Sequence, residues 1–371
     1  MSVTINHQTN HITATNGSVT TDGRTGSNLI INGAMQVAQR GTSVTGLTGT
    51  AFLLDRFKFT NNDHGTWTLS QDTDAPAGFS KSMKMLCTTA DSSVGSSDYS
   101  FFLYKLEGNE VQQLASGTGD AKNVTLSFWV KSNVTGTFSA ILRNEDNNRQ
   151  CGGAYTVNSS GTWEYKTVTI PPDTVAGYTD DNTTALQIEW WLGAGSTFTG
   201  GTLPTSWETS SNADRAGANT VDVGTVTNGY FQITGVQLEV GDTATPFEHR
   251  SYGDELARCQ RYYYRRTSVG SNGSYYRYVT GFHNSTSSAE GVLEMPVEMR
   301  ATPSLSSSGT FAAWDAAAVR SATTVSLGSD GSSKQTINLN ISGISGGTVH
   351  RPVEILSSNN SSSYLELSAE L

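Results

Sequence analysis

The sequence predicts an all-β protein, in which a jelly-roll β-sandwich is followed by a short helix and a second, smaller C-terminal β-domain. Three observations lead to this prediction. Ser, Thr, Gly and Asn dominate the composition, and they favour turns and short strands over helices. Alternating apolar and polar runs repeat between turn signals from about 66 to 240, as they do in sandwiches and barrels. The chain has 371 residues, more than one core usually serves, so we expect two folded domains.

Residues 1–27 form the first element, a polar segment without a large aromatic residue. Such a segment buries too little apolar surface to fold alone, so we expect an extended piece that is held by another protein or by a neighbouring copy. His7 and His11 are four residues apart, a spacing that makes a metal-binding face only on a helix. Because their neighbours do not favour a helix, we predict no metal site there.

Residues 28–248 are predicted to form the jelly-roll sandwich. The run FWVKS places Phe128 and Val130 on one face of a strand, and similar alternation occurs in the neighbouring runs. The run FQITGVQLEV changes its parity at Gly235, which predicts a β-bulge at that position.

Residues 249–266 read HRSYGDELARCQRYYYRR, and they are dense in charged and aromatic side chains. We expect a helix over 253–265, because Leu256, Cys259 and Tyr263 recur at helical spacing. Acidic residues at its start and basic residues at its end suit the helix dipole. The run of tyrosines is equally compatible with the start of a strand.

Two roles remain open for this segment. In the first, three copies of the chain meet at it around a threefold axis; in the second, the helix packs on its own sandwich and closes one end of it. The candidate residues for a subunit interface are Leu256, Tyr262, Tyr263 and Tyr264.

Residues 267–371 contain further short strand signals separated by turns, for example SYYRYVTGFH and KQTINLNIS. The length of this segment, 267–371, suits a second β-domain that is smaller than the first.

The composition excludes several classes of function. The formal net charge is −10, whereas general nucleic-acid binding needs a basic face, so we expect no nucleic-acid partner. The N-terminus lacks the features of a signal peptide, and no apolar run reaches the length of a membrane-spanning helix, so we expect no membrane insertion. The three cysteines, Cys87, Cys151 and Cys259, lack metal-binding spacing, and we expect buried, reduced thiols.

We predict no catalytic residues and no enzymatic activity. The chain has no nucleophile-elbow motif and no P-loop, and its acidic residues lack an arrangement that indicates hydrolysis of a glycosidic bond. No cofactor is expected, although the oxygen-rich loops 143–150 and 177–184 suit structural Ca²⁺. The carboxylates that we considered for acid–base chemistry are Glu189, Glu208, Asp180 and Asp181.

Glycan binding is the more plausible chemistry, since a sugar needs a flat exposed aromatic ring and polar partners for its hydroxyls. Trp190 and Trp191 are adjacent in a strand and therefore point to opposite faces, which predicts one exposed ring. Trp207 falls in a loop, where an aromatic ring is hard to explain by packing. The candidate glycan-binding residues are Trp191, Trp207, Tyr275 and Tyr276, with burial in a core or a subunit interface as the alternative for each.

Several longer phrases resemble a known family. They are NLIINGAMQVAQRGTS (28–43), LLDRF (53–57), VTLSFWVKS (124–132), GTWEYKTVTIP (161–171), FQITGVQLEVGDTATPFEHRSYGDELARCQRYYYR (231–265) and MPVEMRATPSL (295–305). In this order they resemble the tail-fibre and related virion proteins of bacteriophages and prophages. The resemblance covers about 28–305 and leaves both ends of the chain unmatched.

This resemblance implies a sandwich similar to carbohydrate-binding modules and a virion protein, assembled in the host cytoplasm, that is commonly a homotrimer. The expected function is therefore that of a trimeric tail fibre, anchored to other virion proteins through 1–27 and attached to host cell-surface polysaccharide. Two alternatives remain: a head-fibre, capsid-decoration or tail-adaptor protein that binds no receptor, and a polysaccharide depolymerase.

Overall fold

The computed structural model describes residues 2–6, 11–15, 28–269, 274–328 and 330–371. Sheets dominate these residues, and the helices are short, so the predicted all-β class is confirmed. A two-stranded antiparallel hairpin precedes the sandwich, with β1 (Ser2–Asn6) paired to β2 (His11–Thr15). His7 lies outside the described residues, so the expectation for the His7 and His11 pair stays a prediction.

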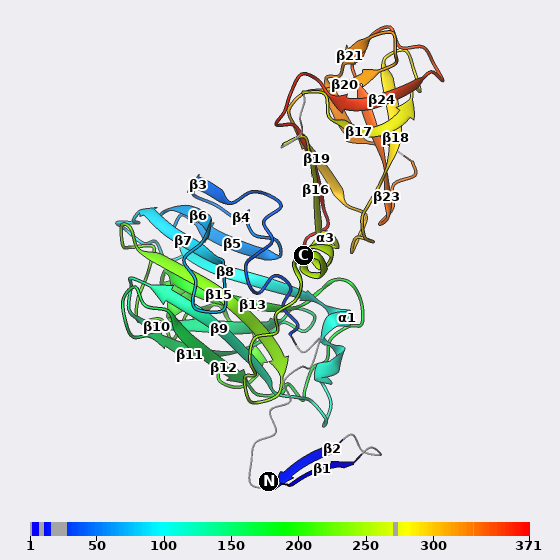
Figure 1. Ribbon diagram of the computed structural model, residues 1–371. Helices are drawn as coiled ribbons and strands as arrows, with labels where there is room; N and C mark the ends of the chain where they lie inside the picture. Colours follow the sequence, from blue (N-terminus) through cyan, green and yellow to red (C-terminus); the bar gives the residue numbers. More distant parts are fainter. Residues whose placement is uncertain (1, 7–10, 16–27, 270–273, 329) are drawn as a thin grey trace.

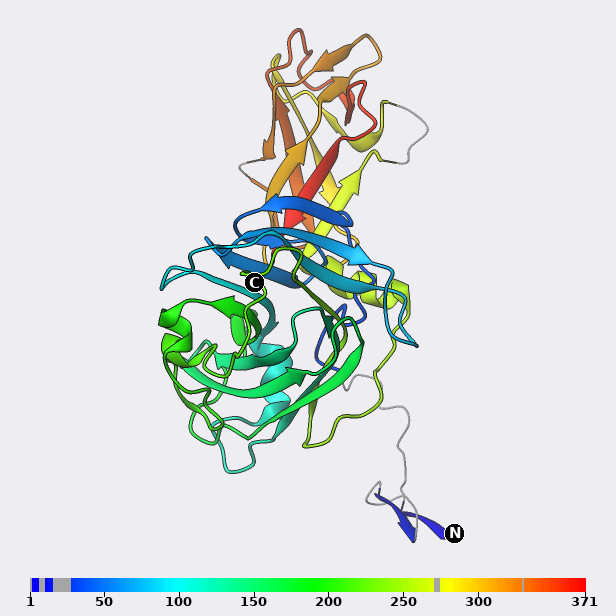
Figure 2. The same ribbon diagram turned by 90° about the vertical axis from the view of Figure 1, so that its left-hand side faces the viewer.

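Two sheets form the sandwich (Figures 1 and 2). The first has the order β14-β11-β10-β13-β8-β5-β4, with β4 (Ala51–Phe52), β5 (Phe57–Asn62), β8 (Tyr99–Glu107), β10 (Gly136–Asn144), β11 (Arg149–Val157), β13 (Thr184–Ala194) and β14 (Glu208–Thr209). The second has the order β12-β9-β15-β7-β6-β3, with β3 (Ser43–Leu47), β6 (Thr66–Asp72), β7 (Ser82–Thr89), β9 (Val124–Ser132), β12 (Glu164–Ile170) and β15 (Tyr230–Val240). Single helical turns occur in the connections: α1 (Gly108–Val111), η1 (Gln112–Leu114), α2 (Ser196–Thr199) and η2 (Asn212–Asp214).

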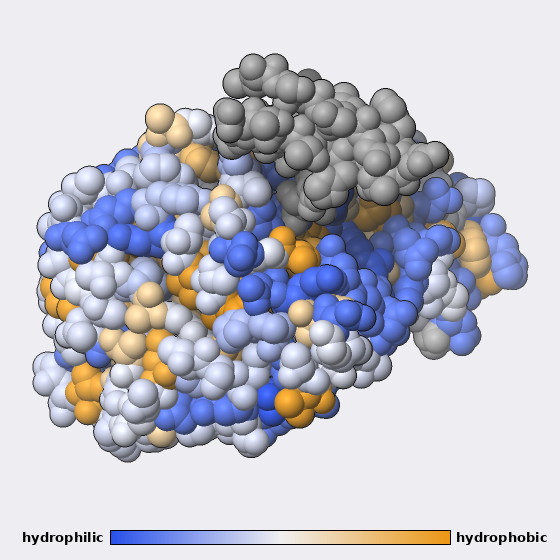
Figure 3. Space-filling model, turned by 90° about the horizontal axis from the view of Figure 1, so that it is seen from below, coloured by the Kyte–Doolittle hydropathy of each residue, from blue (hydrophilic) through white to orange (hydrophobic). Residues whose placement is uncertain are grey.

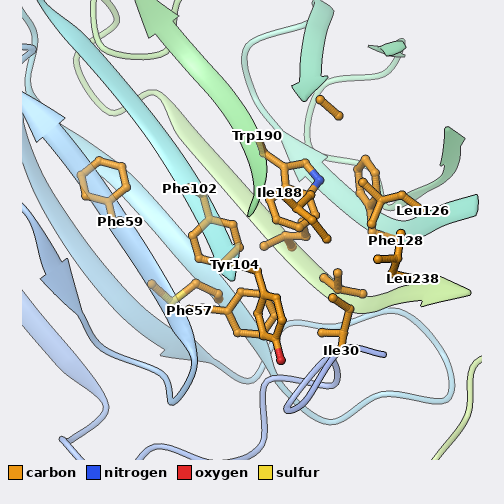
Figure 4. Packing of buried hydrophobic residues seen from close by; sticks show 14 of the residues in the cluster. Ile30, Phe57, Phe59, Phe102, Tyr104, Leu126, Phe128, Ile188, Trp190 and Leu238 are labelled. Atoms are coloured by element: carbon orange, nitrogen blue, oxygen red, sulfur yellow. The ribbon is translucent and has the colours of Figure 1, made fainter. Parts of the chain in front are cut away.

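The main core lies between these two sheets and is rich in aromatic rings (Figure 4). Strand alternation produces it: on β5, Phe57 and Phe59 are fully buried and face Phe102 of β8, and Phe57 stacks on Phe102 at 5.1 Å. Trp190 of β13 completes the row against Phe128 of β9. Burial of rings of this size is the main favourable contribution to the stability of such a domain.

The bulge predicted at Gly235 is confirmed. The pairing of β15 with β9 shifts register between Thr234 and Gln237, and Gly235 has a φ of +62°. A side chain there would meet the rings of Phe79 and Trp129, so the position needs glycine for both its backbone angle and its close contacts.

Helix α3 (Tyr252–Gln260) follows the sandwich and begins at Ser251, whose hydroxyl accepts a hydrogen bond from the Asp254 amide. The helix expected over 253–265 is therefore too long. It ends at Gln260, and the tyrosines begin strand β16 (Tyr263–Thr267), as the alternative interpretation allowed. Strand β16 pairs with β25 (Tyr364–Ser368), which lies about a hundred residues further along the chain. This pairing makes the tyrosines a strand, although their local spacing also suits a helix.

The C-terminal domain consists of two sheets around its own core. The smaller sheet has the order β16-β25-β19, with β19 (Ser304–Ser308). The larger has the order β21-β20-β24-β17-β18-β23-β22, with β17 (Arg277–Phe282), β18 (Ser288–Glu294), β20 (Phe311–Trp314), β21 (Val319–Ser321), β22 (Thr324–Leu327), β23 (Thr336–Ser342) and β24 (Pro352–Ser357). Strands β20, β21 and β24 lie at the end of this domain that is farthest from the sandwich (Figure 1).

The two domains meet at an inter-domain clamp formed by Arg56, Glu107, Arg261, Tyr262 and Glu370. The Arg56 guanidinium is buried over the Tyr262 ring, 3.3 Å from its centroid, and donates to Glu370 at 2.9 Å. Arg261 donates two hydrogen bonds to the Glu107 carboxylate, and the Tyr262 hydroxyl donates to the same group. Charged and aromatic groups in such close contact hold the domains together more firmly than exposed ion pairs would.

The clamp bears on the two roles predicted for 249–266. Tyr262 and Tyr263 are buried by contacts within their own chain, so the proposal that they form a threefold subunit interface is wrong. Leu256 is partly buried against the sandwich core, and Tyr264 is partly buried against the C-terminal core. The helix therefore packs on its own sandwich, and a subunit interface through Leu256 and Tyr264 stays a prediction.

All three cysteines are buried and unpaired, in agreement with the expected reduced thiols. In the described part of the chain, no helix is both long enough and apolar enough to cross a membrane. On the side of the molecule seen in Figure 3, apolar residues are scattered among polar ones.

Candidate functional site

Trp191 is not available to a ligand, and its prediction as a glycan-binding residue is wrong. Its side chain is fully buried on the outer face of the first sheet, where residues 195–222 fold over it. The ring stacks on Phe101 at 4.7 Å, and the indole N–H donates to Glu189 at 2.8 Å. Sequence reasoning correctly placed Trp190 and Trp191 on opposite faces, but both faces are covered.

Trp207 is also explained by packing. Its ring lies against the sandwich core, and its indole N–H donates to the Pro171 carbonyl at 2.8 Å. Because Trp207 is only partly buried, its role in glycan binding stays a prediction.

The two tyrosines in the C-terminal domain differ from each other. Tyr276 is partly buried in the C-terminal core, with its ring against that of Tyr278 at 5.0 Å. Tyr275 is exposed, so its role in glycan binding stays a prediction.

The carboxylates considered for catalysis are engaged elsewhere or lie in loops. Glu189 is fully buried and is held by two hydrogen bonds from Arg215. Glu208 accepts a hydrogen bond from Gln150, and Asp181 accepts two from Thr183. Among the described residues, no group of three or more His, Cys, Asp or Glu side chains is placed to hold a metal ion.

The structure instead shows a distal pocket, a hollow of about 420 Å³ in the C-terminal domain. It lies on β17, β20 and β24 and on the turns beside them, and its size is in the range of small-ligand sites. The residues that line it are Thr280, Gly281, Trp314, Asp315, Ala316, Arg351, Pro352, Val353 and Glu354.

Trp314 provides the flat surface of the distal pocket. Strand β20 reads FAAW, and alternation directs Phe311 and Ala313 into the C-terminal core while Trp314 points outward. The indole side chain is 37% exposed. An exposed ring of this kind on a strand is what the C–H face of a sugar needs.

Polar groups lie beside this ring. Strand β24 lies between β20 and β17 in the sheet. Its Glu354 pairs with Trp314 of β20 on one side and with Thr280 of β17 on the other side. Arg277 donates to the Glu354 carboxylate and lies 5.8 Å from the centre of the Trp314 ring. The row therefore combines a ring, a carboxylate and a hydroxyl on one face.

Asp315 fixes the turn that follows Trp314. Its carboxylate accepts hydrogen bonds from the amides of Ala317 and Ala318 and from Arg320 at 3.1 Å. Burial raises the pKa of Asp315, but these hydrogen bonds outweigh burial and lower its pKa to about 2. Asp315 is therefore an anion that positions the turn, and not a proton donor at neutral pH.

Sequence reasoning missed the distal pocket, although it recognised FAAWDA as a strand. The sequence did contain a signal for Trp314. Side chains alternate between the two faces of a strand, so Trp314, three positions after the buried Phe311, falls on the opposite face. The contributions of Arg351 and Glu354 were not predictable, because β24 follows β20 only after three other strands.

A second hollow, of about 340 Å³, lies beside the inter-domain clamp between Arg40, Phe52, Tyr263 and Glu366. Its polar groups already bind one another, since the Tyr263 hydroxyl donates to Glu366 and Arg40 lies over the Tyr263 ring. We therefore regard the distal pocket as the candidate site.

Fold and site together define a β protein with a jelly-roll-like sandwich and a distal β-domain that carries an aromatic pocket. No protein-family model matches the chain, and no curated protein matches its sequence. Among solved structures, the chain is similar to the enzymatically active domain of bacteriophage CBA120 tailspike protein 4, with 14% identity and a TM-score of 0.32 over 58% of this chain. The chain covers 21% of that tailspike domain.

Two carbohydrate-binding structures are also similar. The tandem CBM22-1–CBM22-2 domain of Paenibacillus barcinonensis Xyn10C matches 95% of this chain and 100% of its own, with 10% identity and a TM-score of 0.28. The family 11 carbohydrate-binding module of Clostridium thermocellum, in complex with a mixed-linked tetrasaccharide, matches 55% of this chain and 97% of its own, with 12% identity and a TM-score of 0.27.

Proposed function

We propose that this protein is a non-enzymatic glycan-binding protein whose binding site is the distal pocket. The observation that carries the proposal is the exposed Trp314 ring beside Glu354 and Thr280, in a hollow of about 420 Å³. The ring offers a stacking surface, and the carboxylate and hydroxyl offer partners for sugar hydroxyls. Strands β20 and β24, which carry Trp314 and Glu354, lie at the end of the molecule farthest from the sandwich (Figure 1), and this leaves room for a long polysaccharide chain.

Replacing Trp314 with alanine is expected to weaken glycan binding. Truncation of a central tryptophan in a binding site typically costs about 2 kcal/mol or more, or a roughly thirtyfold increase in Kd. Purified protein would be screened on an array of bacterial surface polysaccharides, and the Kd of each retained glycan would be measured by calorimetry for both forms.

A matched control is Tyr252→Ala, which removes an exposed aromatic ring from α3, outside the pocket. This variant is expected to keep the wild-type Kd. If no glycan is retained, or if Trp314→Ala binds as well as the wild type, the distal pocket is not a glycan site.

We further propose that the protein belongs to a phage virion, as a trimeric tail fibre that attaches to host surface glycans. The resemblance of 28–305 to phage fibre proteins supports this proposal, and so does the position of β20 and β24, which contribute to the pocket, far from the sandwich (Figure 1). Three copies would multiply a weak single-site affinity through avidity, which suits attachment to a repeating polysaccharide.

The trimer can be tested by sedimentation equilibrium of the intact chain. We expect a mass three times the 39.5 kDa of one chain. Because Tyr262 and Tyr263 are buried inside the monomer, the contacts between copies would involve other surfaces. A single species of 39.5 kDa at micromolar concentration would contradict the trimer, without bearing on the distal pocket.

A further inference from the structure

We propose that the distal pocket selects glycans that carry an anionic group, a carboxylate or a phosphate, and that Arg351 binds this group. The inference rests on the proposed glycan-binding function and adds the class of sugar. It follows from the state of each charged side chain around the pocket.

The two acidic groups of the pocket are already neutralised. Asp315 is bound by Arg320 and by two backbone amides, and Glu354 is bound by Arg277. Neither carboxylate needs a cation from a ligand. Each is also held in place by its partner, so it presents a fixed and compensated charge to the pocket.

Among the residues that line the pocket, Arg351 is the cation, and its donors remain available. The closest carboxylate oxygen, on Asp315, is 3.8 Å from its guanidinium, and that distance is too long for a hydrogen bond. Among the described residues, its guanidinium donates no hydrogen bond, and its side chain is 40% exposed. With Asp315 already satisfied, the guanidinium charge of Arg351 is in excess at the pocket wall.

The backbone of Arg351 is well anchored, which limits how far the side chain can move. Its amide donates to the Thr348 carbonyl at 3.0 Å, and its carbonyl accepts from the His283 amide at 3.0 Å. Arg351 directly precedes β24, which carries Glu354. Arg351 lines the same hollow as Trp314, and its guanidinium lies 3.8 Å from the carboxylate of Asp315, which also lines it.

This arrangement fits an acidic saccharide. A sugar ring that stacks on Trp314 would direct a ring substituent toward the pocket wall, where a planar guanidinium binds a carboxylate or phosphate through two parallel hydrogen bonds. A neutral sugar would leave these donors with water alone. Uronic acids, and sugars that carry phosphate, are the classes with suitable chemistry.

The experiment measures the Kd of the intact protein for matched pairs of saccharides. One pair is oligogalacturonate and the same oligomer as its methyl ester; the other is a mannose-6-phosphate oligosaccharide and its dephosphorylated form. We expect the acidic member of at least one pair to bind at least about tenfold more tightly, as one charge-assisted hydrogen-bonded contact allows. The larger ratio of neutral to acidic Kd shows which anion the pocket prefers: the galacturonate pair tests carboxylate, and the mannose pair tests phosphate.

Arg351→Gln is expected to remove this preference and to leave the Kd of the neutral members unchanged, while Arg351→Lys retains part of it. Arg258→Gln removes an equal charge from the exposed surface of α3 and is expected to retain the preference. Thermal unfolding of each variant checks that it is folded.

Two results would overturn the inference: equal affinity for both members of each pair, or a preference that persists in Arg351→Gln. If the neutral members still bind in a manner that depends on Trp314, the proposed function stands and only the selection of acidic sugars fails. If no saccharide, acidic or neutral, binds in a manner that depends on Trp314, both proposals fail.

Discussion

Replacement of Arg56 with methionine is expected to destabilise the protein by about 3–5 kcal/mol, the cost of breaking a buried ion pair by removing one partner. Arg56 is 2% exposed, and its guanidinium donates to Glu370 at 2.9 Å and to the Lys105 carbonyl at 2.6 Å. Methionine fills much of the same volume but leaves both oxygens without this donor. The free energy of unfolding would be measured by urea titration, followed through tryptophan fluorescence.

The same variant is also expected to loosen the inter-domain clamp. Limited proteolysis should then cut the chain between 261 and 268 faster than in the wild type, because Tyr262 loses the cation that covers its ring. Arg258→Gln is the matched control, since Arg258 makes an exposed pair with Asp254 on α3, and such pairs are worth about 0.5 kcal/mol or less. Equal stability of Arg56→Met and the wild type would show that the clamp does not hold the domains.

Replacement of Trp191 with alanine is expected to cost about 3–5 kcal/mol of unfolding free energy and to leave glycan affinity unchanged. The ring is fully buried between Phe101 and Phe198, and Arg215 lies 4.8 Å from its centroid. Its removal creates a cavity and takes a donor from the buried Glu189.

Trp314→Ala is the comparison variant, because it removes a tryptophan from the pocket instead of from the core. Because Trp314 is 37% exposed and its removal leaves no enclosed cavity, we expect a smaller loss of unfolding free energy than for Trp191→Ala, about 1–2 kcal/mol, together with weaker glycan binding. The two variants together separate a tryptophan that supports the fold from one that contacts ligand. A large loss of glycan affinity in folded Trp191→Ala would contradict the assignment of Trp191 to the core.

The all-β class and the bulge at Gly235 were predictable because they depend on local patterns. The alternation of apolar and polar residues shows which face of a strand is buried. A shift in that alternation by one position indicates the extra residue of a β-bulge. The end of α3 was not fixed by the same reasoning, since the tyrosines suit a helix or a strand. The distant partner β25 decides the outcome for Tyr263.

The candidate site was harder to predict than the fold. Alternation shows that Trp191 points away from the main core, but it cannot show that residues 195–222 fold back over the outer face. In the same way, Trp314 has the parity of an exposed residue, but its partners Glu354 and Arg351 come from a strand and a turn that only the folded sheet brings near. Local sequence identifies which face a ring occupies, and tertiary structure decides whether that face is open.

The chain passes from the sandwich into the distal domain at Tyr262 and comes back beside the same point, where the Ala369 amide donates to the Tyr262 carbonyl at 2.8 Å. The first strand of the distal domain, β16, and its last strand, β25, therefore begin and end next to the same residue of the clamp. The covalent link between the sandwich and the distal domain is a single passage of the chain near Tyr262. A domain with a different pocket could be grafted at this one passage, provided that it supplies a partner for Arg56 in place of Glu370.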